Sequence, residues 1–283
     1  MLNSRNSLAR LCLGVLLLLV LPLSAAATND TQGPEYVLWV GGNAPGRAQR
    51  EVEVITAALE RTRAEFGPYQ LAVSSEPLAA GTWRQQLTEG ERIHIVPTPY
   101  LDFPEEDLTL IPVPISGGLL GYRNLVVRRD RLEEFSGIDD AAGLRHKEAG
   151  QGRDWPDMWV YEANGLPVTG AEDLPQLVAM LEAGDIDYLP LGVEESESII
   201  QKFASDPQSL SIVPNLLIYY PLSSFPVVTN KKPQLIERLS AGLEAMHTDG
   251  TLRLEDLSDR RHPQRPLCQV IKLENPSRLF PVL

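Results

Sequence analysis

Tyr36-Val-Leu-Trp-Val-Gly-Gly42, an apolar run closed by two glycines, decides how this chain begins to fold. A short apolar run bounded by turn residues predicts a buried strand. Apolar side chains then recur at spacings of three and four residues from Val52 to Phe66, which is one face of an amphipathic helix. Gly67-Pro68 ends that helix, and Tyr69–Val73 follows as a second strand. The chain therefore opens as strand, helix and strand.

The alternation of strand and helix continues outward from this segment. A helix over Thr82–Glu89 and a strand over Arg92–Val96 complete the order strand-helix-strand-helix-strand. This order implies a sheet with parallel neighbours that are joined by crossover helices. Two further apolar strands, Leu108–Ile115 and Gly121–Arg128, lie on either side of Ser116-Gly-Gly118.

A second set of alternating elements occupies the later part of the chain. We expect helices over 159–164, 174–181, 194–203 and 233–247, and strands over 186–189, 211–218 and 225–229. Thr169 and Glu172 have the spacing of a capping box before the second of these helices, and Gly184 is a typical stop for it. Two such sets predict an α/β fold with two lobes.

Residues 1–27 have the pattern of a secretory signal peptide. Arg5 and Arg10 precede an apolar run from Leu11 to Leu21, and Ala25-Ala-Ala27 supplies the small residues of a cleavage site. The run is shorter than the roughly 20 apolar residues that span a bilayer. We therefore expect cleavage after Ala27 and a periplasmic protein, with an uncleaved membrane anchor as the alternative.

The composition narrows the class of function. The chain has 283 residues, with 25 lysines and arginines against 38 aspartates and glutamates, and its net charge is −13. An acidic chain repels phosphate groups, so we expect no nucleic-acid partner. Cys12 lies inside the signal segment, which leaves Cys268 without a second thiol for an internal disulfide.

The common motifs of catalysis and metal binding are missing from the sequence. The chain has no G-x-S-x-G elbow, no phosphate-binding loop, no H-E-x-x-H and no G-x-G-x-x-G segment. Its 4 histidines lie far apart, without the spacing of metal ligands. We therefore expect no catalytic residue, no metal and no cofactor.

Gly152-Arg-Asp-Trp-Pro-Asp157 is the most unusual polar segment. Asp154 is a typical helix N-cap, and Pro156 fits a first helical turn. A helix that begins here would offer free N–H groups to a ligand carboxylate or phosphate. Arg153 would add a charged clamp and Trp155 an apolar wall. The alternative is a well-capped helix with Trp155 in the core, and the sequence leaves both open.

Acidic residues gather around one predicted strand. Asp185 and Asp187 precede or begin it, and Glu194 and Glu195 follow it. A solvated loop is the favoured interpretation, and a cleft wall that receives a cationic group is the alternative. Arg123 lies at the start of another predicted strand and gains a binding role only if that strand end lies on a cleft.

The order of elements over residues 35–250 resembles the type 2 periplasmic binding proteins, and in particular the family 3 solute-binding proteins of ABC importers. The segments that carry the resemblance to a divergent branch of that family are Pro114-Ile-Ser-Gly-Gly-Leu-Leu-Gly-Tyr-Arg123, Gly152–Asp157, Met180-Leu-Glu-Ala-Gly-Asp-Ile-Asp187 and Asp249-Gly250. Amino-acid-binding members carry Thr-x-x-Arg after the third strand, and its arginine grips the ligand carboxylate. Here that place reads Thr98-Pro-Tyr-Leu101, without the arginine.

The resemblance implies two lobes joined by two hinge strands, with a discontinuous first lobe. The implied parts are a signal peptide over 1–27, the first part of lobe 1 over 28–115, lobe 2 over 116–221, and the return of lobe 1 with the C-terminal tail over 222–283. It implies a cleft that closes on a small polar metabolite. The expected ligand contacts are Thr98 and Tyr100 from lobe 1, Arg123 after the hinge, and Arg153, Asp154 and Trp155 from lobe 2.

The resemblance also implies the partners. They are a small-molecule ligand and an ABC permease or a membrane sensor, and the protein is expected to be a monomer. Two alternatives stay open. One is a dehydratase-like enzyme on the same scaffold, with Asp154, Asp157 and Glu194 as candidate acids. The other is an adaptor without a ligand, which keeps the fold and recognises a membrane partner.

Overall fold

The computed structural model describes residues 33–79, 81–99, 106–252 and 268–276. The predicted signal peptide and Tyr100 lie outside these ranges. Within the ranges, no helix is both long and apolar enough to cross a membrane.

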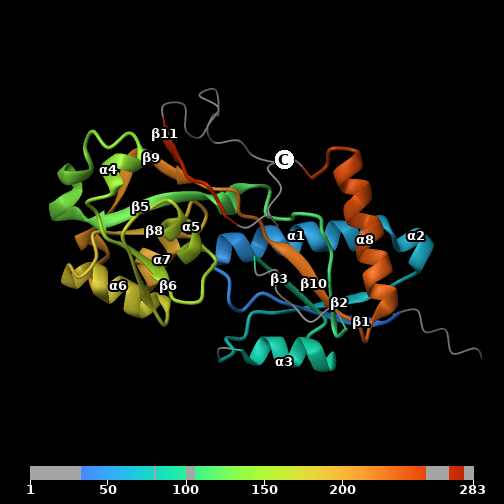
Figure 1. Ribbon diagram of the computed structural model, residues 1–283. Helices are drawn as coiled ribbons and strands as arrows, with labels where there is room; N and C mark the ends of the chain where they lie inside the picture. The colour runs from blue at the N-terminus through green and yellow to red at the C-terminus, as the bar shows by residue number, and fades with distance from the viewer. Residues whose placement is uncertain (1–32, 80, 100–105, 253–267, 277–283) are drawn as a thin grey trace, which may run out of the picture. The chain divides into compact units, whose positions relative to one another are not determined.

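The first sheet has five strands in the described part of the chain, in the order β2-β1-β3-β10-β4 (Figure 1). They are β1 (Glu35–Trp39), β2 (Gln70–Ser74), β3 (Ile95–Thr98), β4 (Leu108–Leu110) and β10 (Phe225–Thr229). β1 runs parallel to β2 and β3, whereas β10 runs antiparallel to β3 and β4. Because β10 comes from late in the chain, the first lobe is built from two separate stretches of sequence, as predicted.

Helices cover both faces of the first sheet (Figure 1). They are α1 (Pro45–Arg61), α2 (Arg63–Phe66), α3 (Thr82–Glu89) and α8 (Pro233–Thr248). Leu38 and Ile95 pack with α1 and α8, whereas Trp39 and Val96 pack with α3 on the opposite face. Successive side chains of a strand point to opposite faces, so the adjacent apolar residues of β1 and β3 serve two cores.

The second sheet has six strands in the described ranges, in the order β11-β9-β5-β8-β6-β7. They are β5 (Tyr122–Arg128), β6 (Ala149–Gly152), β7 (Val168–Ala171), β8 (Tyr188–Gly192), β9 (Leu210–Tyr219) and β11 (Gln269–Lys272). β5 runs antiparallel to β8 and β9, and the remaining neighbours are parallel. β11 follows α8 in sequence, and it extends the second sheet beside β9 (Figure 1).

Helices also cover both faces of the second sheet. The elements are η1 (Leu119–Gly121), η2 (Arg129–Phe135), η3 (Pro207–Ser209), α4 (Ala141–Leu144), α5 (Asp157–Ala163), α6 (Leu174–Ala183) and α7 (Ser196–Phe203). Leu125 and Val127 pack with η2 and α5, whereas Val126 packs with α6 and α7. The sheet is thus buried on both sides, which fits its continuous apolar strands.

Two of the chain segments that connect the sheets touch each other. One runs from β4 to β5, and the other runs from β9 to β10. The Ile115 N–H donates to the Ser224 carbonyl at 2.9 Å, and the Tyr220 N–H donates to the Gly121 carbonyl at 3.2 Å. Gly121 allows this approach, because a Cβ there would lie 2.4 Å from the Tyr220 carbonyl oxygen. These segments lie where the resemblance implied two hinge strands, and here they are irregular chain with the short helix η1 (Leu119–Gly121) in one of them.

Several local predictions were wrong. Thr169 does not cap α6, because it lies in β7 and its hydroxyl donates to Glu148. Asp173 is the N-cap instead and accepts from the Gln176 N–H at 2.9 Å. Asp154 is not an N-cap either, since α5 begins at Asp157. The sequence analysis also missed β6, β7 and β11, which are short strands of four residues each.

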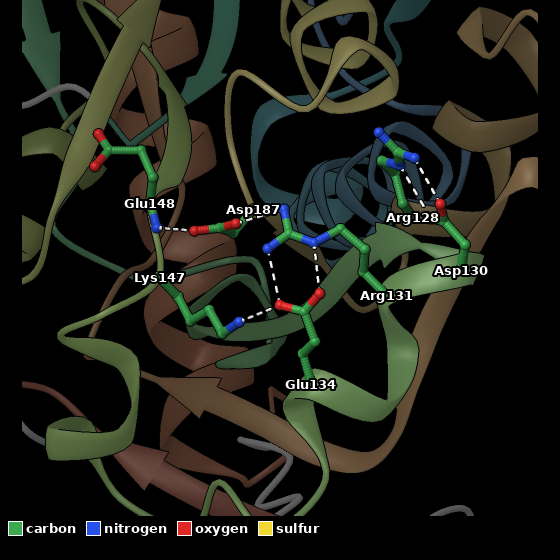
Figure 2. A network of polar contacts seen from close by, with 7 residues as sticks. All are labelled: Arg128, Asp130, Arg131, Glu134, Lys147, Glu148 and Asp187. Carbon is green, nitrogen blue, oxygen red and sulfur yellow. Dashed lines mark hydrogen bonds and ion pairs between the residues drawn. The ribbon is translucent and has the colours of Figure 1, made fainter.

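A network of charged side chains ties η2 to the strands beside it (Figure 2). Arg131 donates two hydrogen bonds to Glu134 of its own helix. It also forms an ion pair at 2.6 Å with Asp187, which lies just before β8. Lys147 donates to Glu134 at 2.6 Å, and Asp187 accepts from the Glu148 N–H at 2.7 Å. The network lies at the N-terminal end of β8, so the contacts of Asp187 hold neighbouring elements of the second lobe together.

Candidate functional site

A cavity of about 10 Å³ lies where α1 of the first lobe meets the second lobe. Its lining residues are Arg47, Arg50, Glu51, Ser116, Leu119, Leu120, Gly192, Val193, Glu194 and Glu195. They come from the first turns of α1, the hinge segment before β5 and the loop between β8 and α7. We call its five charged members, Arg47, Arg50, Glu51, Glu194 and Glu195, the cleft cluster.

The sequence folds so that the cluster's two halves end at the same place. α1 begins at Pro45 after the turn that closes β1, and its first two turns carry Arg47, Arg50 and Glu51. The other half follows Gly192 at the carboxyl end of β8. In α/β sheets, ligand sites lie at the carboxyl ends of strands and at the helices that follow them.

Two ion pairs cross between the lobes at the cavity. Arg50 Nε donates to Glu194 Oε1 at 2.8 Å, and Arg47 Nη1 lies 3.7 Å from Glu195 Oε1. The backbone is close as well, since a Cβ on Gly46 would lie 2.8 Å from the Glu194 carbonyl oxygen. The first turn of α1 is therefore in direct contact with the loop that follows β8.

The two arginines of α1 differ in what else they contact. Arg47 Nε donates to the fully buried Glu51 at 3.0 Å, one helical turn along. Glu51 also accepts from Asn43 at 2.5 Å, so its charge is compensated within the first lobe. Burial opposes the charge on Arg47, yet Glu51 and Glu195 raise its pKa above the ordinary value. Arg50, by contrast, is held by Glu194 of the other lobe.

Glu194 is ionised at a cost. Burial raises the pKa of its carboxyl above the ordinary value. The hydrogen bond from Arg50 lowers this pKa, and the charges of Glu195 and Glu51 raise it again. A neighbouring anion disfavours the charged form of a carboxylate, as does burial. The arrangement can therefore accept a proton or another cationic group at Glu194.

Another ion pair, between Arg123 and Asp157, is buried beside the cluster and does not line the cavity. Arg123 Nη2 donates to Asp157 Oδ1 at 2.7 Å, and Arg123 Nε donates to the Tyr220 hydroxyl at 2.9 Å. Tyr220 in turn donates to Asp157, which closes the triangle. Burial and the Asp157 charge hold the pKa of Tyr220 well above its ordinary value. Glu195 acts on Arg123 electrostatically, so this group borders the cleft cluster.

None of the predicted ligand contacts within the described ranges lines the cavity. Thr98 is buried at the end of β3, and Arg123 is buried against Asp157. Arg153 and Asp154 are exposed, and Arg153 lies 3.6 Å from Glu172. Ligand contact by these residues stays a prediction, as it does for Tyr100 outside the described ranges.

Trp155 has a structural explanation. A Cβ on Gly152 would lie 2.3 Å from the Trp155 ring, which therefore lies directly over that glycine. The half-buried ring packs against the core formed by α6 and α7. The contact favours the alternative of a core tryptophan, and it explains why the segment begins with glycine.

The sequence analysis missed Arg47, Arg50 and Glu51. Arg47 and Arg50 lie in the first turns of an amphipathic helix, where charged residues usually face solvent. Glu51 lies on the buried face of that helix, which apolar periodicity does not reveal for a carboxylate. Arg47 and Glu51 have the i, i+4 spacing of a helical ion pair, but that spacing carries no sign of a cleft. Glu194 and Glu195 were named, and the structure favours the alternative of a cleft wall over a solvated loop.

The three acids of the enzyme alternative have different surroundings. Asp154 is exposed, Asp157 is paired with Arg123, and Glu194 is paired with Arg50. Over the residues that the structure describes, no group of three or more histidine, cysteine, aspartate or glutamate side chains could hold a metal ion.

Comparison with known proteins identifies the fold. No family model matches the chain, and no curated protein matches it. Among solved structures, it is similar to an amino acid ABC transporter substrate-binding protein from Streptococcus pneumoniae bound to L-arginine. The identity is 14%, the TM-score is 0.51, and the match covers 77% of this chain and 90% of that chain.

The chain is also similar to an ancestral arginine-binding protein bound to arginine, at 15% identity and a TM-score of 0.50. The match covers 78% of this chain and 96% of that chain. At this identity the likeness shows the fold, which is the two-lobed type 2 periplasmic binding protein fold. The predicted fold class and the structural resemblance to family 3 solute-binding proteins are confirmed.

Proposed function

We propose that this chain is a periplasmic receptor of the solute-binding protein type, which closes its two lobes on a small polar metabolite. It acts as a monomer and presents the closed form to an ABC permease or a membrane sensor. The observation that supports this most is the Arg50–Glu194 ion pair, because it joins the lobes at the cavity between them. The fold and the signal-peptide pattern of residues 1–27 agree with export and ligand binding.

The charges of the cleft cluster indicate the kind of ligand. When the lobes separate, Arg47 keeps Glu51, and Arg123 keeps Asp157. The first lobe then offers the guanidinium of Arg50, and the second lobe offers the carboxylates of Glu194 and Glu195. A ligand with one anionic group and at least one cationic group would satisfy both sides. L-arginine, the ligand of the similar Streptococcus pneumoniae protein, carries both kinds of charge.

The test is ligand recovery followed by titration. Native mass spectrometry of freshly purified protein should show a co-purified small molecule, and calorimetry should show binding of charged metabolites, L-arginine included. Arg50→Ala should weaken binding, because it removes the guanidinium that the first lobe offers. Arg63→Ala is the matched control, since Arg63 is an exposed arginine that pairs with Glu60, lies over the Tyr69 ring and does not line the cavity. Equal loss in both variants, or no binding by the wild type, would refute the proposed site.

The volume of the cavity favours a second candidate function. About 10 Å³ is close to the space of a single water molecule, so a metabolite enters only when the lobes separate. A chain whose lobes stay together would be an adaptor that recognises a membrane partner without a ligand. Distance measurements between the lobes distinguish the two, because the adaptor shows one distance with and without added metabolites.

A further inference from the structure

The cleft cluster contains more carboxylates than guanidinium groups. Arg47 and Arg50 face Glu51, Glu194 and Glu195 around the same small cavity. The side chains of Arg50 and Glu194 are 36% and 22% exposed, so this pair is only partly hydrated. An unbalanced carboxylate in such a place is disfavoured, because less water is present to stabilise its charge.

The charges beside the cluster do not remove the imbalance. Arg123 adds no net positive charge next to the cluster, because its guanidinium forms an ion pair with the Asp157 carboxylate at 2.7 Å. Arg123 is also close enough to Glu195 for the two charges to attract each other. The groups that face the cluster from β5 and α5 are therefore one cation and one anion, and the excess carboxylate remains.

The excess falls on Glu194. Glu51 accepts two hydrogen bonds within its own lobe. Glu195 is attracted by the charges of both Arg47 and Arg123. Glu194 has its ion pair with Arg50 across the cleft, next to the two other carboxylates. Burial and those neighbours raise the pKa of Glu194 in spite of that pair.

We propose that closing the two lobes takes up one positive charge at Glu194, supplied either by a proton or by the cationic group of a bound ligand. The part that concerns the ligand rests on the proposed function, whereas the proton part concerns this chain alone. A cationic ligand then competes with the proton for the same carboxylate, and its binding at acidic pH releases a proton.

The direction of the pH effect follows from where the pKa is raised. In the open form Glu194 is hydrated and separated from Arg50 and Glu51, so its pKa returns towards the ordinary 4.5. The closed form has the raised pKa. The contribution of Glu194 protonation to closure is therefore complete below pH 4.5, and it is lost as the pH rises through the raised pKa of the closed form. Uptake of one proton changes the ratio of closed to open forms by at most about tenfold per pH unit.

The experiment measures the distance between the lobes of the ligand-free chain as a function of pH. Spin labels replace the exposed Gln85 on α3 and Gln201 on α7, with Cys268 changed to serine. The closed fraction of the wild type should rise as the pH falls from 7 towards 4.5. Glu194→Gln is neutral at every pH, so its closed fraction should show no pH dependence over the same range. Glu197→Gln, at an exposed position on α7 three residues after Glu194, should behave like the wild type.

A wild-type distance that does not change with pH would overturn the inference. So would a pH dependence that persists unchanged in Glu194→Gln. Calorimetry with L-arginine, in two buffers of different ionisation enthalpy, tests the ligand separately and should show proton release that grows as the pH falls towards 4.5. Absence of L-arginine binding together with an intact pH response would count against that ligand and not against proton uptake on closure.

Discussion

Gly46→Ala should shift the lobes towards the open form. Gly46 is the second residue of α1, and a Cβ there would lie 2.8 Å from the Glu194 carbonyl oxygen of the other lobe. Ordinary contact begins at 3.4 Å, so the two lobes must separate by about 0.6 Å at this point. The atom that must give way is backbone, and rotation of a side chain cannot relieve the contact.

The size of the shift follows from the cost of overpacking. Inserting a methyl group into a filled contact costs about 1–3 kcal/mol. The closed form pays this cost and the open form does not, so the ratio of open to closed forms rises about 5- to 150-fold. Alanine is a better helix former than glycine by about 0.5–1 kcal/mol, and that gain applies to both forms. The free energy of unfolding should therefore change little.

The assay is the distance between labels on α3 and α7, with thermal unfolding measured on the same samples. Gln49→Ala is the matched control, because Gln49 is exposed on α1 and bonds only to Glu53. An unchanged distance in Gly46→Ala, together with a clearly lower unfolding midpoint, would refute the reasoning. That result would mean that the closed form absorbs the strain and that the lobes do not separate at this contact.

Three further predictions concern stability. Asp157→Asn leaves the buried Arg123 without a counter-charge, so urea unfolding should show a loss of about 3–5 kcal/mol. Arg131 and Lys147 hold the pKa of Glu134 at about 2, below the ordinary 4.5. The stability that this carboxylate contributes is therefore present above pH 4.5 and is lost as the pH falls towards 2. In acid titrations of stability, Glu134→Gln should abolish this part of the pH dependence. Gly242→Ala places a Cβ 2.2 Å from the Ala58 carbonyl oxygen, where α8 crosses α1, and should cost at least about 1–3 kcal/mol of unfolding free energy in urea.

The fold was predictable because apolar periodicity is strong in this chain. The run that forms β1 and the helical spacing that follows it gave the first lobe, and Phe225–Thr229 was located to the residue. The strands that were missed are short and poor in apolar residues, such as Ala149–Gly152. Their neighbours in the sheet stabilise them, and a local pattern carries little of that information.

The site was harder to predict, because it depends on contacts between residues distant in sequence. Arg50 and Glu194 are 144 residues apart, and each belongs to a pattern that is typical of a solvated surface. Gly152–Asp157 attracted notice for its unusual residues, yet the structure uses Trp155 to cover Gly152. Unusual local composition thus indicated packing, and ordinary charged residues formed the cavity.

The position of the arginines explains why the fold alone does not give the ligand. The resemblance places a ligand-gripping arginine three residues after Thr98, and this chain has Leu101 there. The cationic groups at the cavity come from α1 instead, through Arg47 and Arg50. The Arg50 guanidinium holds the lobes together through Glu194, and in the proposed function it also binds the ligand. A ligand must therefore displace the Glu194 carboxylate from Arg50. Under the proposed function, ligand affinity includes the cost of breaking the Arg50–Glu194 pair, which an arginine grip located within one lobe does not have.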